Sequence, residues 1–292
     1  MRVRAVRKEK SGELDIADWV DRTRDPYAED DTLWVPVIAS EPCDREIPER
    51  TRYRGRGYYR VGDIAVLHGN EPSQAEIEAI AGFCHPRGIL WIRSLQDITR
   101  TPETQLVWGC GGEVSHREAG FTYILDPEKV MFSMGNREEK ARIARMVRNN
   151  PRVERIADMF AGIGYFSIPL AGAGAEVHAM EINPVAYGYL IRSIQANNLS
   201  GRITPSLGDC RQILSGTYDR IVMGHFDAVT MLPDALRHAA PGSVIHVHSI
   251  SPVEELVREH VACAGFSATI HVHRVKKYRP YAWHMVHDVY LA

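Results

Sequence analysis

The residues best suited to chemistry in this chain lie between Asp158 and Glu181. An apolar, strand-like run ends at Gly162 and Gly164, a short helix-like segment follows, and Glu181 closes a second strand-like run at 175–181. The glycines let the backbone approach a ligand closely, and the start of a helix offers unpaired N–H groups. An acid at the end of the next strand can accept both hydroxyls of a ribose. The arrangement predicts a site for a ligand that carries a nucleoside.

The glycine pattern favours S-adenosylmethionine (SAM) over a dinucleotide. The third glycine of the dinucleotide fingerprint G-x-G-x-x-G is replaced by Ser167, and no second nucleotide-binding half follows. Asp209, after a later strand-like run, stands where the adenine of a nucleoside ligand is expected in a wound sheet. A dehydrogenase that uses NAD and a tight turn with no ligand are the alternatives.

The expected elements place these residues in one sheet. From residue 152 onward, strand-like and helix-like segments alternate as in a doubly wound parallel sheet. The last two strands have no room for a helix between them, so they must be antiparallel. The fold class is therefore α/β, a Rossmann-like sheet with an antiparallel edge strand, as in class I methyltransferases. Strands are expected at 153–160, 175–181, 202–207, 218–223, 243–249, 267–275 and 283–291, and helices at 164–173, 184–197, 228–240 and 253–264.

Two smaller parts are predicted before this sheet. Residues 1–48 are polar and contain four prolines and one strand-like run, at 33–38, which indicates a short N-terminal extension. Residues 49–135 are expected to form a small α+β module that faces RNA. Its strands are expected at 62–67, 88–93 and 121–125, and its one helix, at 73–84, begins with a capping box of Ser73 and Glu76. Residues 136–292 are the predicted SAM-binding domain.

The composition excludes several classes of protein. The five cysteines are scattered, odd in number and without C-x-x-C spacing, which argues against disulfides and zinc. Two histidine pairs alternate along strands, but no acid or cysteine completes a site by motif, so no metal is expected. No apolar run approaches the roughly 20 residues that span a bilayer, and the first residues do not resemble a signal peptide. A cytoplasmic protein without a membrane partner is expected.

Two segments resemble a known family of tRNA-modifying enzymes. Asp158–Leu170, and Glu181–Tyr187 with the Asn197-Asn198 that follows, are similar to the tRNA guanosine-37 group. That group joins the N1-methyltransferases of position 37 to the wybutosine-synthesizing protein 2 enzymes. The resemblance covers residues 55–292 of this chain.

Three further stretches favour the wybutosine branch. Residues 130–140 resemble its FS-x-GN-x-x-EK pattern, and residues 275–284 resemble its VKSYAP…WH ending. The fourth strand of the sheet ends in Met223-Gly224, where the methyltransferases carry Asn-Leu-Pro. The resemblance implies transfer of the 3-amino-3-carboxypropyl chain of SAM to carbon 7 of 4-demethylwyosine in tRNA(Phe), which releases methylthioadenosine. Methylation of guanosine 37 is the nearest alternative, and a non-catalytic RNA-binding protein is another.

The same resemblance implies the partners and some of the site. The expected partner is the anticodon loop of tRNA(Phe), with no obligate protein partner, and the co-substrate is SAM. Ser133 and Lys140 match positions that hold SAM in the wybutosine branch, and Lys140 would meet the carboxylate of the methionyl chain. His225, after the fourth strand, is a candidate contact to the target base. The predicted cofactor residues are together Ser133, Lys140, Asp158, Gly162, Gly164, Glu181, Asp209 and Cys210.

Basic segments are candidates for binding RNA. Arginines from Arg50 to Arg60 alternate with tyrosines, a pattern that can hold phosphates and stack on bases. The other candidates are the basic faces Arg142/Arg145/Arg148/Arg152 and Lys276/Lys277/Arg279. A solvated basic surface is the alternative for each of them.

Overall fold

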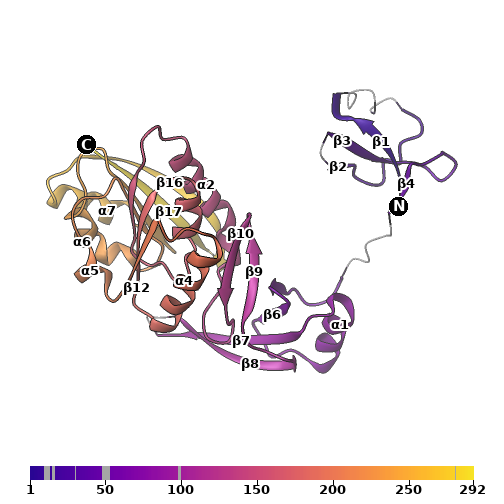
Figure 1. Ribbon diagram of the computed structural model, residues 1–292, viewed down its shortest axis with the longest axis horizontal. Coiled ribbons are helices and arrows are strands. Elements are labelled where there is room, and N and C mark those ends of the chain that lie inside the picture. The colour runs from indigo at the N-terminus through magenta and orange to yellow at the C-terminus, as the bar shows by residue number, and fades with distance from the viewer. Residues whose placement is uncertain (10–13, 15–16, 30, 48–52, 98–99, 280) are drawn as a thin grey trace. The chain divides into compact units, whose positions relative to one another are not determined.

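The computed structural model describes residues 1–9, 14, 17–29, 31–47, 53–97, 100–279 and 281–292. The chain divides into two compact units, Met1–Arg54 and Gly55–Ala292, whose elements are labelled in Figure 1. Arg50 and Arg52, predicted to bind RNA, lie outside the described residues.

The first unit is a small antiparallel sheet with the strand order β2-β3-β1-β4. Its strands are β1 (Arg2–Arg7), β2 (Tyr27–Glu29), β3 (Thr32–Pro36) and β4 (Arg45–Glu46). Val3, Val35 and Val37 are buried and form its core. The sequence indicated only the strand around β3, because β2 and β4 are short and mostly exposed.

The second unit begins with a four-stranded sheet that carries one helix. Its strands pair in chain order: β5 (Tyr59–Val61), β6 (Ile64–His68), β7 (Gly88–Gln96) and β8 (Thr101–Gly109). Helix α1 (Gln74–Cys84) connects the parallel strands β6 and β7. The expected capping box is confirmed, because the Ser73 side chain accepts from the Glu76 N–H while Glu76 accepts from the Ser73 N–H. These reciprocal bonds satisfy donors that a helix start leaves free.

A seven-stranded sheet with helices on both faces makes up most of the second unit (Figure 1). In pairing order its strands are β13 (Ile203–Leu207), β12 (Glu176–Glu181), β11 (Arg155–Asp158), β14 (Arg220–Met223), β15 (Val244–Ser249), β17 (Ala282–Leu291) and β16 (Ala268–Arg279). The helices are α2 (Arg137–Arg148), α3 (Ser167–Gly172), α4 (Pro184–Ala196), α5 (Cys210–Ile213), α6 (Leu232–Leu236) and α7 (Glu254–Cys263), with 3-10 turns at η2 (Met134–Asn136) and η3 (Ala228–Met231).

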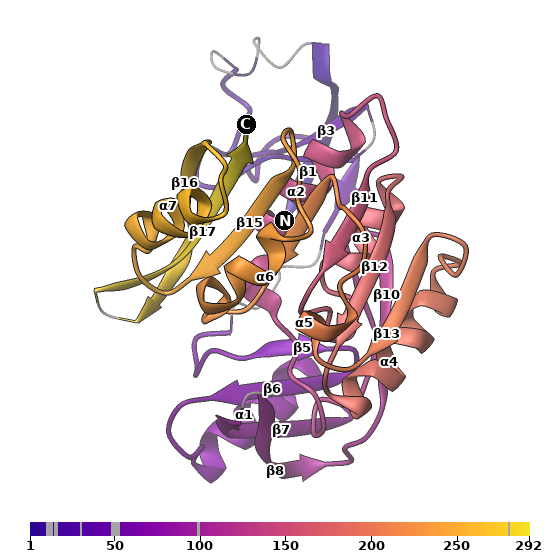
Figure 2. The same cartoon turned by 90° about the vertical axis from the view of Figure 1, so that its left-hand side faces the viewer.

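Each face of this sheet has its own hydrophobic core. Alternate strand residues point to opposite faces, so Ile156 packs in one core and its neighbour Ala157 packs in the other. The first core contains α2, α3 and α4, and the second contains α5, α6 and α7, the helices seen over the sheet in Figure 2. Because both faces are covered, the central strands are apolar along their length, as the sequence indicated.

The predicted antiparallel pairing is present, and the reversed strand is β17. This strand runs antiparallel to both β15 and β16, so it lies second from the edge of the sheet. The helix expected at 228–240 is wrong in extent, because η3 and the short α6 take its place and Pro233 falls in the first turn of α6. Proline fits a first helical turn but lacks the N–H that a helix interior needs.

A hairpin connects the smaller sheet to the larger one. It consists of β9 (Val114–Glu118) and β10 (Phe121–Leu125) and lies along α4 (Figure 1). The Thr122 N–H donates to Asn197 Oδ1 at 2.9 Å, and the Ile124 N–H donates to Ser193 Oγ at 3.0 Å. The hairpin is therefore hydrogen-bonded to α4 of the large-sheet domain. The predicted domain boundary between residues 135 and 136 stays a prediction.

Candidate functional site

A cavity of about 430 Å³ opens at the carboxyl ends of the central strands. The strand order reverses between β11 and β14, which is where ligands bind in wound sheets. Its walls come from the loops after β11, β12 and β14, from the segment before α2, from β16 and from the small sheet. The lining residues that matter below are Tyr59, Arg100, Phe132, Ser133, Phe160, Gly162, Tyr165, Phe166, Glu181, Gly224, His225, Phe226, Lys276 and Tyr278.

Glu181 is fixed on the cavity wall by backbone donors. Its two carboxylate oxygens accept the Gly162 and Asn183 N–H groups, each at 2.7 Å. Burial raises the pKa of Glu181, and these backbone hydrogen bonds partly oppose that rise. Each carboxylate oxygen can accept a second hydrogen bond, so the carboxylate keeps capacity for a ligand hydroxyl.

The turn between β11 and α3 depends on both predicted glycines. Gly162 and Gly164 have φ angles of +57° and +101°, a region that side chains rarely adopt. A Cβ on Gly162 would lie 2.6 Å from the ring of Tyr165. The turn occupies residues where the sequence predicted the end of a strand and the start of a helix, so β11 ends at Asp158 and α3 begins at Ser167.

Asp158 lies at the end of β11, is hydrogen-bonded to the residue that follows the turn, Ser167, and does not line the cavity. Its Oδ2 accepts the Ser167 N–H at 3.0 Å and the Ser167 hydroxyl at 2.6 Å. The residue is fully buried with no cation bonded to it among the described residues, and burial raises its pKa to about 6. Its place indicates that Asp158 shapes the loop that carries Gly162.

Asp209 and Cys210 follow β13 and lie outside the cavity lining. Asp209 caps α5 by accepting the Arg211 N–H, and it forms an ion pair with the Arg211 guanidinium. Cys210 is buried, and burial raises the pKa of its thiol to about 11. The Gly208 N–H donates to the backbone oxygen of Glu181 at 2.8 Å, so this loop adjoins the Glu181 end of the cavity.

Of the two residues predicted from the FS-x-GN-x-x-EK pattern, only Ser133 lines the cavity. Lys140 is 3% exposed and forms an ion pair with the equally buried Glu118 of β9. Its Nζ lies 5.5 Å from the ring centre of Phe132 and 5.7 Å from that of Tyr165, both of which line the cavity. Burial lowers the pKa of Lys140, and Glu118 opposes that shift. Lys140 therefore lies behind the rings of Phe132 and Tyr165, and Glu118 already balances its charge.

Two cations that the sequence did not place at the cofactor line the cavity, Lys276 and Arg100. Among the described residues neither forms an ion pair or a hydrogen bond through its side chain. Burial lowers the pKa of Lys276, and the nearby charges of Arg100 and Lys140 lower it further. Lys276 Nζ occupies the space above Gly135, where a Cβ would clash with it. The VKSYAP-like segment contained Lys276, whereas no motif indicated Arg100.

An aromatic wall stands beside these cations. His225 stacks on Phe160 with ring centres 5.4 Å apart, and Phe226 meets Tyr278 edge-on at 5.2 Å. Burial lowers the pKa of His225, so its ring is neutral near pH 7. His225 Nδ1 accepts the Asp227 N–H at 3.3 Å, which leaves the ring proton on Nε2. Flat rings with a donor at their edge suit an unstacked base.

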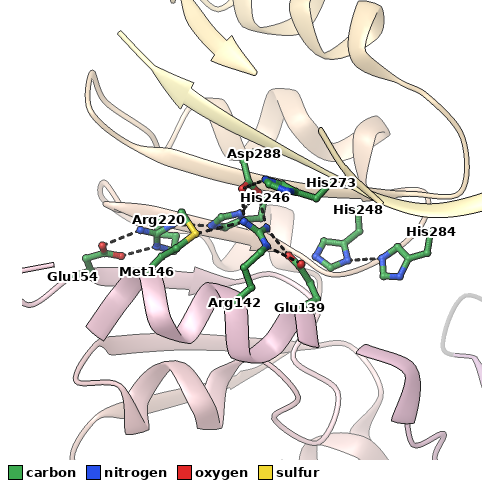
Figure 3. Close-up of polar contacts among 10 residues, drawn as sticks. All are labelled: Glu139, Arg142, Met146, Glu154, Arg220, His246, His248, His273, His284 and Asp288. Atoms are coloured by element: carbon green, nitrogen blue, oxygen red, sulfur yellow. Dashed lines mark hydrogen bonds and ion pairs between the residues drawn. The ribbon is translucent and has the colours of Figure 1, made fainter. Parts of the chain in front are cut away.

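Behind the cavity a chain of buried charges joins α2 to the sheet (Figure 3). Arg142 is bonded to Glu139 and Asp288, each at 2.6 Å. His246 Nδ1 lies 2.5 Å from Asp288, and its Nε2 lies 2.7 Å from the guanidinium of Arg220. Arg220 in turn pairs with Glu154 at 2.7 Å. Arg142 was predicted to face RNA, but its charge is met within the protein.

A histidine pair lies between this chain of charges and the cavity. His248 Nδ1 and His284 Nε2 are 2.9 Å apart, and both rings are buried (Figure 3). Burial lowers the pKa of both, that of His284 to about 4, so the pair is neutral near pH 7. His248 packs on Phe166 and His284 packs on Phe226, so the pair supports the cavity wall. Within the described ranges no three His, Cys, Asp or Glu residues are grouped to hold a metal ion.

Comparison with known proteins identifies the family. Residues 114–276 match the sequence profile of the TRM5/TYW2 methyltransferase domain. The chain belongs to the TRM5/TYW2 family. The family resemblance and the Rossmann-like fold predicted from the sequence are thereby confirmed.

Individual relatives of this TRM5/TYW2 protein come from both branches. The tRNA(Phe) (4-demethylwyosine(37)-C(7)) aminocarboxypropyltransferase of Methanocaldococcus jannaschii is 34% identical over 80% of this chain and 97% of the relative. The crystal structure of M. jannaschii TYW2 with AdoMet has a TM-score of 0.64 and 27% identity, covering 80% of this chain and 99% of that one. The crystal structure of Trm5b from Pyrococcus abyssi has a TM-score of 0.75 and 26% identity, covering 99% of both chains.

Among the described residues, no helix has the length and apolar character to cross a membrane.

Proposed function

We propose that this protein transfers the 3-amino-3-carboxypropyl group of SAM to carbon 7 of 4-demethylwyosine at position 37 of tRNA(Phe). The observation that supports it most is the charge pattern of the cavity. Glu181 lies on one wall, and on another lie Lys276 and Arg100, which form no ion pair with any residue that the structure describes. A nucleoside that bears an amino acid needs an acceptor for its ribose and a cation for its carboxylate. The similarity to a named aminocarboxypropyltransferase over nearly its whole length supports the choice of transferred group.

In this proposal the adenosine lies at the Glu181 end. Glu181 accepts the ribose hydroxyls, and the turn of Gly162 and Gly164 leaves room for the ligand. Asp209 and the Cys210 backbone adjoin this end through the Gly208–Glu181 hydrogen bond, where the adenine edge is expected. Asp158 acts through the turn that it holds.

The methionyl chain points toward Ser133 and the cations. Lys276 and Arg100 can bind a carboxylate without first breaking an ion pair, because neither forms one among the described residues. The Arg100 guanidinium lies over the ring of Phe226, 5.1 Å from its centre. Lys140, predicted for this role, would first have to exchange Glu118 for the ligand carboxylate. Lys276 and Lys140 both remain candidates for binding the carboxylate, but only Lys140 must first break an ion pair.

The chemistry requires the γ carbon of that chain to face the base. Carbon 7 bonds to the γ carbon, the bond between the γ carbon and sulfur breaks with its electrons going to sulfur, and the proton on carbon 7 passes to water. Positioning in line with the breaking bond supplies most of the rate. His225 would donate its Nε2 proton to an oxygen of the target base while the aromatic wall holds the ring.

Methylation of guanosine 37 at N1 is the second candidate. The observation in its favour is the match of Trm5b over 99% of this chain, which includes residues 1–54. Against it stands Met223-Gly224-His225, where the methyltransferases of the resemblance carry Asn-Leu-Pro. Recognition of the anticodon loop and a cytoplasmic location are further parts of the main proposal.

A product assay separates the two candidates. The protein is incubated with SAM and with tRNA(Phe) that carries either guanosine or 4-demethylwyosine at position 37, and the small products are identified by mass spectrometry. We expect methylthioadenosine, formed only with the wybutosine precursor. S-adenosylhomocysteine formed with the guanosine substrate would overturn the proposal.

A binding measurement tests the role of Glu181. Because Glu181→Ala removes the acceptor for two hydroxyls, SAM affinity should fall at least about 100-fold, measured by calorimetry. Glu176→Ala is the matched control, since Glu176 is an exposed acid at the other end of β12. Equal SAM affinity in the two variants would contradict the ribose role.

A further inference from the structure

The hairpin of β16 and β17 extends beyond the cavity and exposes large aromatic side chains near its tip. Tyr281 is fully exposed, Tyr278 is 45% exposed and Trp283 is 38% exposed. Tyr278 lines the cavity, so the exposed rings continue from the cavity wall along the hairpin. Exposed aromatic side chains gathered in one place mark interaction surfaces.

The same segment is basic. No aspartate or glutamate occurs between Ala268 and His287, whereas the strand leading to the tip carries Arg274, Lys276, Lys277 and Arg279. In the part of the chain that the structure describes, none of these four forms an ion pair. Their charge is therefore available to an anionic partner.

Two β-bulges divide these cations between the two faces of the hairpin. Lys276 pairs in register with the buried His284 and lines the cavity, whereas Lys277 pairs with Trp283. The register shifts on either side, between Arg274 and Lys276 and between Lys277 and Arg279. Cross-strand partners share a face, so Lys277 lies on the same face as Trp283.

Edge protection accounts for only part of this pattern. β16 is the edge strand of the sheet, and lysines on an edge strand prevent pairing with other chains. That role does not require exposed aromatic rings. Arg274 lies over the ring of Trp283 at 5.6 Å, an arrangement that combines a flat surface with a positive charge. Proteins that bind single-stranded nucleic acid combine these two features.

We propose that the tip of the β16–β17 hairpin is a docking surface for single-stranded RNA that flanks the nucleotide in the cavity. Tyr281 and Trp283 stack on bases. Lys277 contacts a phosphate on the face of Trp283, and Arg279, in the last residue pair before the tip, contacts a phosphate at the tip. The inference rests on the proposed function, since that function brings RNA to the cavity. Lys276 remains with the co-substrate on the other face.

The first test removes the stacking ring. Tyr281→Ala in the full-length protein should weaken binding of a fluorescent anticodon stem-loop RNA by about 5- to 100-fold, the loss typical of one stacked base. Leu256→Ala on α7 is the control, because Leu256 is 39% exposed, close to the 38% of Trp283, and lies outside the hairpin. SAM affinity, measured by calorimetry, should be the same in both variants and in the wild type.

The second test removes two charges. Lys277→Gln/Arg279→Gln should lower the slope of log affinity against log salt by about 1.4, because each phosphate contact on a single strand contributes about 0.7. Arg237→Gln/Arg258→Gln makes the same change in net charge at side chains that are 64% and 53% exposed and paired to local acids. The control pair should leave the slope unchanged.

The outcomes distinguish this inference from the proposed function. RNA affinity and salt slope that match the controls in both hairpin variants would overturn the docking surface, even if the wild type releases methylthioadenosine. Weakened RNA binding in the hairpin variants, together with S-adenosylhomocysteine from the wild type, would support the surface and overturn the proposed reaction.

Discussion

Two charged regions of the Gly55–Ala292 unit differ in how their charges are met. Between α2 and the sheet, a continuous chain is formed in which each charged group contacts an opposite charge; its members are Arg142, Asp288, His246, Arg220 and Glu154 (Figure 3). At the cavity, Lys276 and Arg100 form no ion pair with any residue that the structure describes. The histidine pair His248/His284 lies between the two regions, because its rings pack on the cavity residues Phe166 and Phe226.

The difference separates charges that stabilise the fold from charges that await a ligand. Burial alone would raise the pKa of Asp288, but hydrogen bonds from His246 and Arg142 outweigh burial and lower it. From the residues that the structure describes, Lys276 receives no such compensation, and its pKa is lowered by burial and by nearby positive charges. A carboxylate from a ligand would relieve that unfavourable state.

Removing Asp288 should have the largest effect. Asp288→Ala leaves Arg142 and His246 without their shared acceptor, so the free energy of unfolding should fall by about 3–5 kcal/mol in chemical denaturation. Asp227→Ala is the control, since the Asp227 side chain is 84% exposed and its loss should change stability by less than about 0.5 kcal/mol. Similar stabilities in the two variants would show that the chain of charges is not stabilising.

Replacing Lys276 and Lys140 in turn compares a cavity lysine that has no ion pair among the described residues with a buried lysine that has one. Lys276→Ala should weaken SAM binding roughly 10- to 100-fold and leave methylthioadenosine binding nearly unchanged, because only SAM carries the carboxylate. Lys140→Ala should mainly lower stability, since it leaves the buried Glu118 without its closest cation. Lys277→Ala controls for the loss of a lysine on the same strand. A loss specific to SAM in Lys140→Ala alone would assign the carboxylate to Lys140.

The smallest expected effect is a pH dependence from Asp158. Its folded-state pKa, about 6, lies above the unfolded value, so the stability that it contributes is present at low pH and is lost as pH rises through about 6. Relative to Asp158→Asn, the wild type should lose roughly 1–2 kcal/mol between pH 4 and pH 6, measured by urea unfolding at each pH. A difference between the two proteins that does not vary with pH would contradict the shift.

Local features of the site could be predicted from the sequence, and distant ones could not. Glu181 and the glycine turn belong to one strand–turn–helix–strand unit, so their proximity follows from chain order. Glu118, the partner of Lys140, lies on β9, and the sequence predicted the neighbouring strand β10 but not β9. The orientation of Lys276 depends on two β-bulges, and bulges leave no mark in apolar periodicity.

The same reasoning explains the fold. Strands of the large sheet are apolar along their length because both faces are covered, so they could be recognised. β8 was missed because its residues are mostly exposed and no apolar run marks it. The helix expected at 228–240 begins only at Leu232, with Pro233 in its first turn. The apolar pattern of the segment runs through Pro233 without a break, so it did not indicate this start.

The β9–β10 hairpin determines where this chain can be cut. A fragment that starts after Leu125 would strip Asn197 and Ser193 of their backbone partners and expose Gly172, whose surface the Phe121 ring covers. It would also leave Lys140 buried without Glu118. A minimal fragment for crystallisation or library screening should therefore begin before Val114 and retain β17, since Asp288 holds α2 to the sheet.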